Sequence, residues 1–285
     1  MAAFFYGLPI WLATSVILVT ALIVGLGTSF GCRKLLGLRA TDREAEAAAL
    51  SLMQVVAAYI GILIAFAGVK VWQDFADAEN AVHREAAAAA QLYRNLATYG
   101  EETRAARQDL RVYVTSIVRD EWPLLPKGDA SKATDASLYK LFEGIGSVRP
   151  QDDRDATIYT EAYTDLNNLV SLRRDRLIHS ESQMPLILWI VGLFGSILIV
   201  AYTATFPATR INTMMIAGIS LALGLVFLFI LVVDRPFMGR FSVSSSELSG
   251  LSEKFDQLDR LSAAERSTVS ADSPKPEAQP LANRS

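Results

Sequence analysis

The chain has 285 residues, of which 51% are hydrophobic and 20% are charged, and its formal net charge is −3 at pH 7. A mean hydropathy of +0.27 is too high for an ordinary soluble domain with this charge content, and the acidic balance argues against a nucleic-acid-binding protein. Because Cys32 is the one cysteine, an internal disulfide framework and a single-chain cysteine zinc site are excluded.

Four apolar stretches predict an all-α membrane protein with four transmembrane helices. They cover residues 9–30, 50–72, 185–206 and 212–233, and none contains Asp or Glu. A helix of about 20 apolar residues crosses a hydrocarbon core of about 30 Å. Residues 1–8 carry no Lys or Arg, whereas a signal peptide starts with basic residues, so we expect the first stretch to be a retained span.

The spans divide the chain into a first hairpin at residues 1–72, a large extramembrane helical domain at 73–184 and a second hairpin at 185–233. No Gly or Pro occurs between Gly68 and Gly100, and Ala, the best helix former, is abundant there. We therefore predict that the second span continues as one helix from Leu50 to Tyr99, into the domain.

Apolar residues at helical spacing predict three further helices in the domain, over residues 110–117, 138–145 and 158–177. The first should end at Trp122-Pro123, since Pro breaks a helix. A post-membrane segment follows at residues 234–266. Residues 267–285 are rich in Ser and Pro and are expected to form a disordered tail.

The sequence leaves the membrane orientation open. The first loop holds Arg33, Lys34, Arg39 and Arg43, and the loop between spans three and four holds Arg210. The positive-inside rule would place these loops in the cytoplasm and the domain outside. Arginines just before span three and just after span four favour the opposite orientation.

Residues near the span ends are candidate membrane-interface anchors. Three of them form an aromatic belt on the domain's side of the membrane: Trp11, Trp72 and Trp189. Three others precede span three: Arg173, Arg174 and Arg176. These arginines are expected to anchor the structure, to meet anionic lipid headgroups, or to pair with Asp74, Asp77 and Glu79.

Several segments resemble the bestrophin-like-domain membrane proteins of bacteria and plants, a family of unknown function. The matching segments, in order, are Ile64-Ala65-Phe66, His83-Arg84-Glu85-Ala86, Leu92-Tyr93-Arg94, Leu110-Arg111-Val112-Tyr113-Val114, Asp120-Glu121-Trp122-Pro123, Arg173-Arg174-Asp175-Arg176-Leu177, Pro185-Leu186-Ile187-Leu188-Trp189 and Asp234-Arg235-Pro236-Phe237-Met238-Gly239. The family is distantly similar to bestrophins, which are pentameric anion channels with four spans. The resemblance implies an oligomeric channel whose second span lines the pore.

The chain departs from bestrophins in two respects. Bestrophins follow the Pro-Phe element with an acidic, calcium-binding run, but Gly239-Arg240-Phe241-Ser242-Val243 follows it here, so no calcium site is expected. Bestrophins also keep the region between spans two and three in the cytoplasm, against the orientation that the loop charges favour.

One stripe of span two is the candidate pore surface: Tyr59, Ile62, Phe66, Val69 and Gln73. In a ring of copies, Ile62 and Phe66 would form a hydrophobic constriction that gates by dewetting. The alternative is that the stripe packs against span one or three, or faces lipid.

Charged residues beside this stripe could form the pore mouth. A ring of Lys70 would favour anions, whereas Asp74 and Asp77 would favour cations, so ion selectivity stays open. Alternatively, Lys70 extends its charge to the membrane interface beside Trp72.

Small residues recur four positions apart in the spans, which favours close helix packing, either within one chain or between chains. The pairs are Gly25/Ser29, Gly27/Gly31, Gly192/Ser196, Gly218/Ala222 and Ser220/Gly224.

No HExxH or GxSxG pattern occurs, so no enzyme motif, cofactor or metal site is indicated. No carboxylate lies in mid-span, which argues against a proton-coupled pump. We expect a homo-oligomeric ion channel of the bacterial inner membrane, with lipids, further copies of itself and inorganic ions as partners. The alternative is a non-conducting scaffold or sensor whose helical domain binds a partner.

Overall fold

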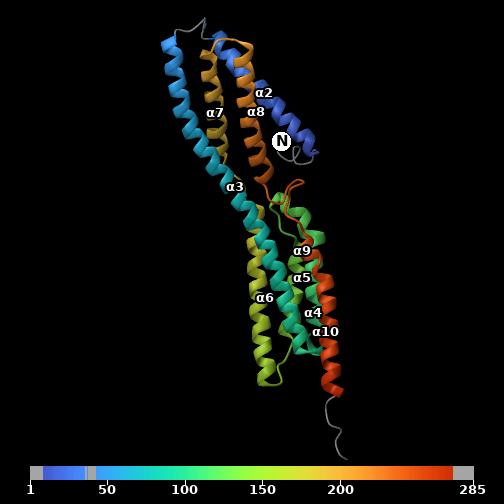
Figure 1. The fold of residues 1–285 in the computed structure, drawn as a ribbon. Helices are drawn as coiled ribbons and strands as arrows, with labels where there is room; N and C mark the ends of the chain where they lie inside the picture. The colour runs from blue at the N-terminus through green and yellow to red at the C-terminus, as the bar shows by residue number, and fades with distance from the viewer. Residues whose placement is uncertain (1–8, 36, 38–42, 272–285) are drawn as a thin grey trace, which may run out of the picture. The chain divides into compact units, whose positions relative to one another are not determined.

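The computed structural model describes residues 9–35, 37 and 43–271, and Arg39 and the tail beyond residue 271 lie outside them. Within these ranges all regular elements are helical and no strand occurs (Figure 1). The expected all-α fold class is therefore confirmed.

Four helices are long and apolar enough to cross a membrane, as expected. They are α2 (Ile10–Leu35), α3 (Arg43–Tyr99), α7 (Leu186–Tyr202, followed by the 3-10 turn η4, Thr203–Thr205) and α8 (Arg210–Val233). Each predicted span lies within one of these helices to within a residue or two, when η4 is counted with α7. The first helix, α2, continues five residues beyond the predicted end at residue 30, to Leu35.

The continuation of span two is also confirmed. α3 is a single helix of 57 residues, which corresponds to a length of about 85 Å at 1.5 Å per residue. It ends at Gly100, whose φ of 132° is readily adopted only by glycine. The long run without Gly or Pro therefore accounts for the continuity of the helix, and Gly100 accounts for its end.

The chain separates into two compact units. The first contains the chain up to residue 81, with residues 124–129 and 174–244, and so includes the apolar parts of all four spanning helices. The second contains residues 82–123, 130–173 and the chain from 245 onward. The predicted post-membrane segment 234–266 is thus divided between the two units.

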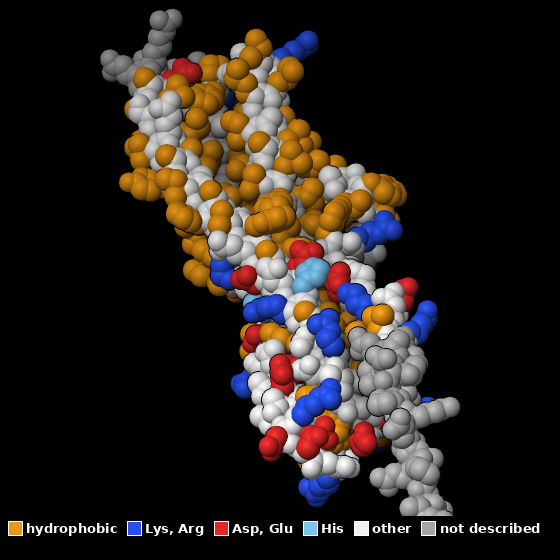
Figure 2. Space-filling model, turned by 60° about the horizontal axis from the view of Figure 1, so that its bottom comes forward, with side chains coloured by type: hydrophobic (Ala, Val, Ile, Leu, Met, Phe, Trp, Pro, Cys, Tyr) orange, Lys and Arg blue, Asp and Glu red, His pale blue; other side chains and the backbone are white. Residues whose placement is uncertain are grey.

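In the first unit, one face of α3 packs into an apolar core. Ile64, Ala67 and Val71 are buried at the spacing of one helical face. The core cluster is completed by Met184, Ile230 and Val233. The chain therefore covers this side of α3 with its own residues. On the face drawn in Figure 2, hydrophobic side chains dominate the spanning helices and charged ones gather on the helical domain.

Small residues allow α2 and α8 to approach each other closely. A Cβ atom at Gly25 would overlap the Ser220 side chain, and one at Gly224 would lie 2.8 Å from the Cβ of Ala21. At Gly27 and Gly218 an added Cβ would meet no atom within 4 Å. Gly25/Ser29 and Ser220/Gly224 therefore pack within the chain, whereas Gly27/Gly31 and Gly218/Ala222 face outward.

The three predicted helices of the domain are also present. They are α4 (Arg104–Ser116), α5 (Lys132–Gly146) and α6 (Asp153–Ser180), with the short turn η1 (Glu101–Thr103) before α4. A π-helical turn, η2 (Ile117–Glu121), and a 3-10 segment, η3 (Trp122–Lys127), follow α4 where Trp122-Pro123 was expected to end it. Two helices were not predicted: α9 (Ser246–Ser249) and α10 (Leu251–Ala271), which runs past the expected start of the tail at residue 267.

The Gly25 contact predicts a strong difference between two neighbouring glycines. Gly25→Ala should destabilise the protein by about 1–3 kcal/mol, because the new methyl group overlaps Ser220 and forces the helices apart. Gly27→Ala is the matched control and should be neutral or stabilising by up to about 1 kcal/mol, since Ala is the better helix former. Thermal unfolding in mild detergent measures both, and equal melting temperatures would contradict the close packing.

Candidate functional site

The predicted pore stripe lies on the face of α3 that points away from the core of the first unit. Tyr59, Ile62, Phe66 and Val69 are between 53% and 73% exposed, and Gln73 is exposed as well. The interpretation that this stripe packs against span one or three is therefore wrong for the chain by itself. Lipid or another copy of the chain is left to cover it.

The exposed stripe is longer than the sequence analysis indicated. Val55 and Leu52, one and two turns before Tyr59, are 55% and 56% exposed. The stripe then alternates steps of three and four residues: Leu52, Val55, Tyr59, Ile62, Phe66, Val69, Gln73. This 3.5-residue period is typical of helices that pack along their length against other helices. Searching span two for a heptad would have found the two missed residues.

The charges beside the stripe are partly balanced within α3. Lys70 donates a hydrogen bond to Asp74 one turn further along, and the two form an ion pair. The Lys70 side chain is 56% exposed and that of Asp74 only 18%. Asp77 is exposed and has no ion-pair partner among the described residues. Near the end of the stripe, the positive charge of Lys70 is thus neutralised by Asp74, whereas the negative charge of Asp77 is not neutralised within the described part of the chain.

The three candidate tryptophan anchors have different surroundings. Trp11 and Trp72 are 67% and 56% exposed. Trp189 is half-buried, and its ring centroid lies 6.2 Å from that of Phe227 on α8. Trp189 therefore contributes to packing between α7 and α8. The place of all three at a membrane interface stays a prediction.

Two of the three candidate arginine anchors are buried, which corrects the expectation that they meet lipid headgroups. Arg176 is fully buried. Arg173 is 7% exposed and binds the buried Glu121 through Nε and Nη2, and Asp135 at 2.7 Å through Nη1. Arg173 does not pair with Asp74, Asp77 or Glu79. Arg174 is exposed, so its role as an anchor stays a prediction.

The Arg173 ion pair is a structural feature of the second unit. Burial by itself lowers the pKa of Arg173, but the hydrogen bond and charge of Glu121 outweigh burial, so the pKa is raised. Glu121 also accepts a hydrogen bond from the backbone N–H of Ser131, at the start of α5. The pair therefore joins η2, α5 and α6, and removing one partner would leave a buried charge uncompensated.

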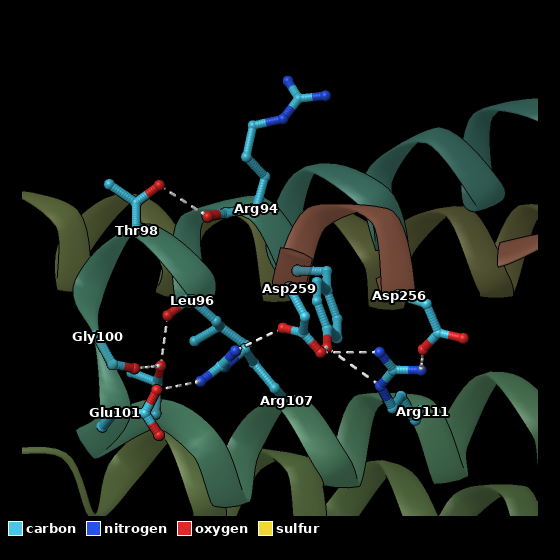
Figure 3. Close-up of polar contacts among 11 residues, drawn as sticks. Arg94, Leu96, Thr98, Gly100, Glu101, Arg107, Arg111, Asp256 and Asp259 are labelled. Carbon is cyan, nitrogen blue, oxygen red and sulfur yellow. Dashed lines mark hydrogen bonds and ion pairs between the residues drawn. The ribbon is translucent and has the colours of Figure 1, made fainter. Parts of the chain in front are cut away.

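A polar network that the sequence analysis missed fastens α10 to α3 and α4 in the second unit (Figure 3). The Asp259 carboxylate accepts hydrogen bonds from the Tyr93 hydroxyl at 2.6 Å, Arg107 Nη1 at 2.6 Å and Arg111 Nη2 at 2.9 Å. Arg111 Nη1 also pairs with Asp256 at 2.8 Å. We call this set of contacts the α10 clamp.

An aromatic stack supports the α10 clamp. The rings of Tyr93 and Phe255 lie 4.0 Å apart and nearly parallel, and the Arg111 guanidinium lies over both, 5.1 and 5.5 Å from their centroids. Leu248, Leu251 and Phe255 are buried at helical spacing. That spacing is the sequence signal that could have revealed a packed helix in the post-membrane segment.

The α10 clamp shifts the protonation of its members. Burial alone would raise the pKa of Asp259, but hydrogen bonds from Tyr93 and Arg111 and the charge of Arg107 outweigh it and lower the pKa. Burial, followed by the hydrogen bond to Asp259, raises the pKa of Tyr93 to about 12. At neutral pH the clamp therefore combines a carboxylate with a neutral phenol and two guanidinium groups.

The sequence pattern of the bestrophin-like domain matches residues 15–248, which include most of span one, all of the other three spans and the helical domain. The chain belongs to the bestrophin-like domain family. This confirms the resemblance found in the sequence. The matched region ends before α10 begins at Leu251, so α10 itself lies outside it.

Solved structures with the same fold include a variant of a bacterial bestrophin homologue from Klebsiella pneumoniae and a variant described as a membrane protein. Each has a TM-score of 0.65 and 13% sequence identity, and each alignment covers 86% of this chain and 98% of the other. At this identity the similarity shows the fold alone. No curated protein matches the chain by sequence. Together with the apolar helices, family membership shows that this is a membrane protein.

The α10 clamp predicts that α10 loosens in acid. Because the pKa of Asp259 is lowered in the folded protein, its stabilising contribution is complete above the ordinary value of 3.8 and is lost as the pH falls through the lowered pKa. At neutral pH, Asp259→Asn should weaken the docking of α10 by about 1 kcal/mol, a modest value because the side chain is partly exposed.

Hydrogen exchange of the backbone amides in residues 251–261 measures this effect. A loss of about 1 kcal/mol should speed exchange roughly fivefold. Asp256→Asn is the matched control, since Asp256 pairs with Arg111 alone and is more exposed, and its effect should be smaller. Unchanged exchange in Asp259→Asn would show that the clamp does not hold α10.

Proposed function

We propose that several copies of this bestrophin-like protein assemble in a bacterial inner membrane around a passive ion-conducting pore lined by α3. The observation that carries the proposal is the uncovered heptad stripe of α3, from Leu52 to Gln73, whose opposite face is packed in the core. One face of α3 is held by its own chain, and the other carries a stripe with the spacing of a coiled coil. Such a helix is suited to meet equivalent helices of other copies around a symmetry axis.

The α3 stripe differs from the other exposed apolar surfaces of the spans. α2, α7 and α8 also expose large apolar side chains, such as Ile23, Phe194 and Met214, as expected of surfaces that face lipid. On α3 the exposed line continues without a break in the helix to Gln73 and the charged residues Lys70, Asp74 and Asp77. An apolar path that leads to polar residues is what a pore with a hydrophobic constriction requires.

Within this proposal, Ile62 and Phe66 form the constriction. Their side chains project from adjacent turns of the same face, and Phe66 is 71% exposed. In a ring, one Phe66 from each copy would narrow the path and expel water when closed. The resemblance to bestrophins, which are pentameric channels, favours a ring of five.

Phe66→Ala tests the constriction. Removing the ring should ease wetting of the pore and raise ion flux into proteoliposomes by about tenfold, equivalent to a barrier lowered by about 1.4 kcal/mol. Phe194→Ala on α7 is the matched control, because Phe194 is the same residue type with a similar exposure of 68%, and it should leave flux unchanged. Flux is measured with ion-sensitive dyes on protein of verified oligomeric state.

Two outcomes would contradict the pore. One is a folded oligomer that passes no ions, with or without Phe66→Ala. The other is a protein that stays monomeric in mild detergent. Either would favour the non-conducting scaffold or sensor.

The pairing of Lys70 with Asp74 makes a second prediction. Lys70→Gln leaves the Asp74 carboxylate unbalanced beside Asp77 and should shift the permeability ratio toward cations by roughly fivefold, the effect of about 1 kcal/mol between unit charges at 4 Å in water. Reversal potentials across bilayers with a salt gradient measure this ratio. Lys140→Gln, at an exposed position on α5, is the control. If the permeability ratio shifts toward anions or does not change, Lys70 and Asp74 do not line the ion path.

A further inference from the structure

An apolar cavity of about 250 Å³ lies between α2, α7 and α8 in the first unit. Its lining includes Val24 on α2, Leu193 and Ile197 on α7, and Leu223 and Phe227 on α8. Apolar cavities of about 150 Å³ in proteins already stay dry and bind small apolar molecules. This cavity is therefore large enough to admit a small apolar group.

Close contacts on two sides keep the cavity open. Gly25 touches Ser220, and Gly224 touches Ala21, so α2 is held against α8. The hydroxyl groups of Ser29 and Thr203 lie 3.1 Å apart and join α2 to the end of α7. The three helices are thus fixed around a space that they do not fill with their own side chains.

The buried serines of the lining do not form a binding site for water. Ser196 Oγ donates to the carbonyl oxygen of Gly192, and Ser220 Oγ to that of Ile216, both at 2.8 Å. Each hydroxyl is therefore satisfied within its own helix. A buried water needs two to four polar partners, and the hydroxyl protons of these two serines are already donated to backbone oxygens.

One side of the cavity is open to the outside of the helix bundle. Val16, Leu193 and Ile197 line it and are 39%, 47% and 43% exposed. Because α2, α7 and α8 are all membrane-spanning helices, this opening faces the hydrocarbon of the bilayer. A lipid acyl chain is the apolar molecule present there.

Basic residues stand at one end of the cavity. Thr28 lines it, and Arg33 and Lys34 follow in the last turn of α2. Arg33 donates through Nε and Nη2 to the carbonyl oxygen of Ala204, both at 3.3 Å, which holds the guanidinium beside η4. Lys34 is exposed, and neither residue pairs with a carboxylate in the part of the chain that the structure describes. Their charge suits an anionic headgroup.

We infer that an anionic diacyl phospholipid binds here, with one acyl chain in the cavity between α2, α7 and α8 and its phosphate at Arg33 and Lys34. Thr28 and Arg33 are separated by about 7.5 Å along the helix axis, at 1.5 Å per residue. This distance suits a headgroup attached to a chain that descends into the cavity. The site is independent of whether α3 lines a pore.

The test is lipid binding to the delipidated full-length protein, followed by native mass spectrometry and thermal stability. Dioleoyl phosphatidylglycerol should bind most tightly and raise the melting temperature. Dioleoyl phosphatidylcholine should bind more weakly because it lacks the net negative charge. Inorganic phosphate alone should not stabilise the protein, since the acyl chain supplies the apolar contact.

Two pairs of variants distinguish binding of the lipid's acyl chain from binding of its headgroup. Thr20→Phe places a ring in the cavity and should weaken binding of both lipids about tenfold. Val19→Phe, at an exposed position outside the lining, should have no effect. Lys34→Gln should reduce the preference for phosphatidylglycerol severalfold, whereas Arg240→Gln, on the exposed segment after α8, should not.

Some results would overturn the inference. If Thr20→Phe binds both lipids as the unaltered protein does, the acyl chain is elsewhere. If Thr20→Phe changes the oligomeric state and leaves lipid binding intact, a second copy of the chain covers the cavity. If Thr20→Phe lowers the stability of the lipid-free protein, Thr28→Phe replaces it in the test, because Thr28 lines the same cavity from another turn of α2. Unchanged binding of both lipids by Thr28→Phe would likewise overturn the inference.

Discussion

The unbroken backbone hydrogen bonding of α3 is the constraint on which the rest of the structure depends. Each N–H and C=O group in its interior is satisfied inside the helix, so the same helix can pass through hydrocarbon and continue in water. The side chains alone must then suit each environment. Ile64, Ala67 and Val71 bury one face in the first unit, and Tyr93 takes part in the α10 clamp of the second.

The two units differ in how their charged and apolar side chains find partners. In the second unit, charged side chains from distant segments neutralise one another: Arg173 with Glu121, and Arg107 and Arg111 with Asp259. In the first unit, the chain leaves apolar side chains exposed on all four spanning helices. Those surfaces are stable only when something apolar covers them, and lipid and further copies of the chain are the available partners.

Local properties of the sequence were enough to predict the helices. Apolar length identified the four spans, and the absence of Gly and Pro between Gly68 and Gly100 predicted the continuity of α3. The polar contacts could not be predicted, because they join residues far apart in the chain. Arg173 lies shortly before a span, which suggested an interface anchor, but its burial beside Glu121 is a tertiary property. Asp259 likewise gains its role only when α10 reaches Tyr93 and Arg111.

The contact between Gly25 and Ser220 also bears on how the protein matures. These residues sit near opposite ends of the chain, so the ribosome must produce the second hairpin before α2 meets its permanent neighbour. Until then the glycine surface of α2 borders lipid or whatever insertion machinery receives it. Completion of the bundle is therefore a late event, and contacts of such long sequence separation form slowly compared with those inside a single hairpin.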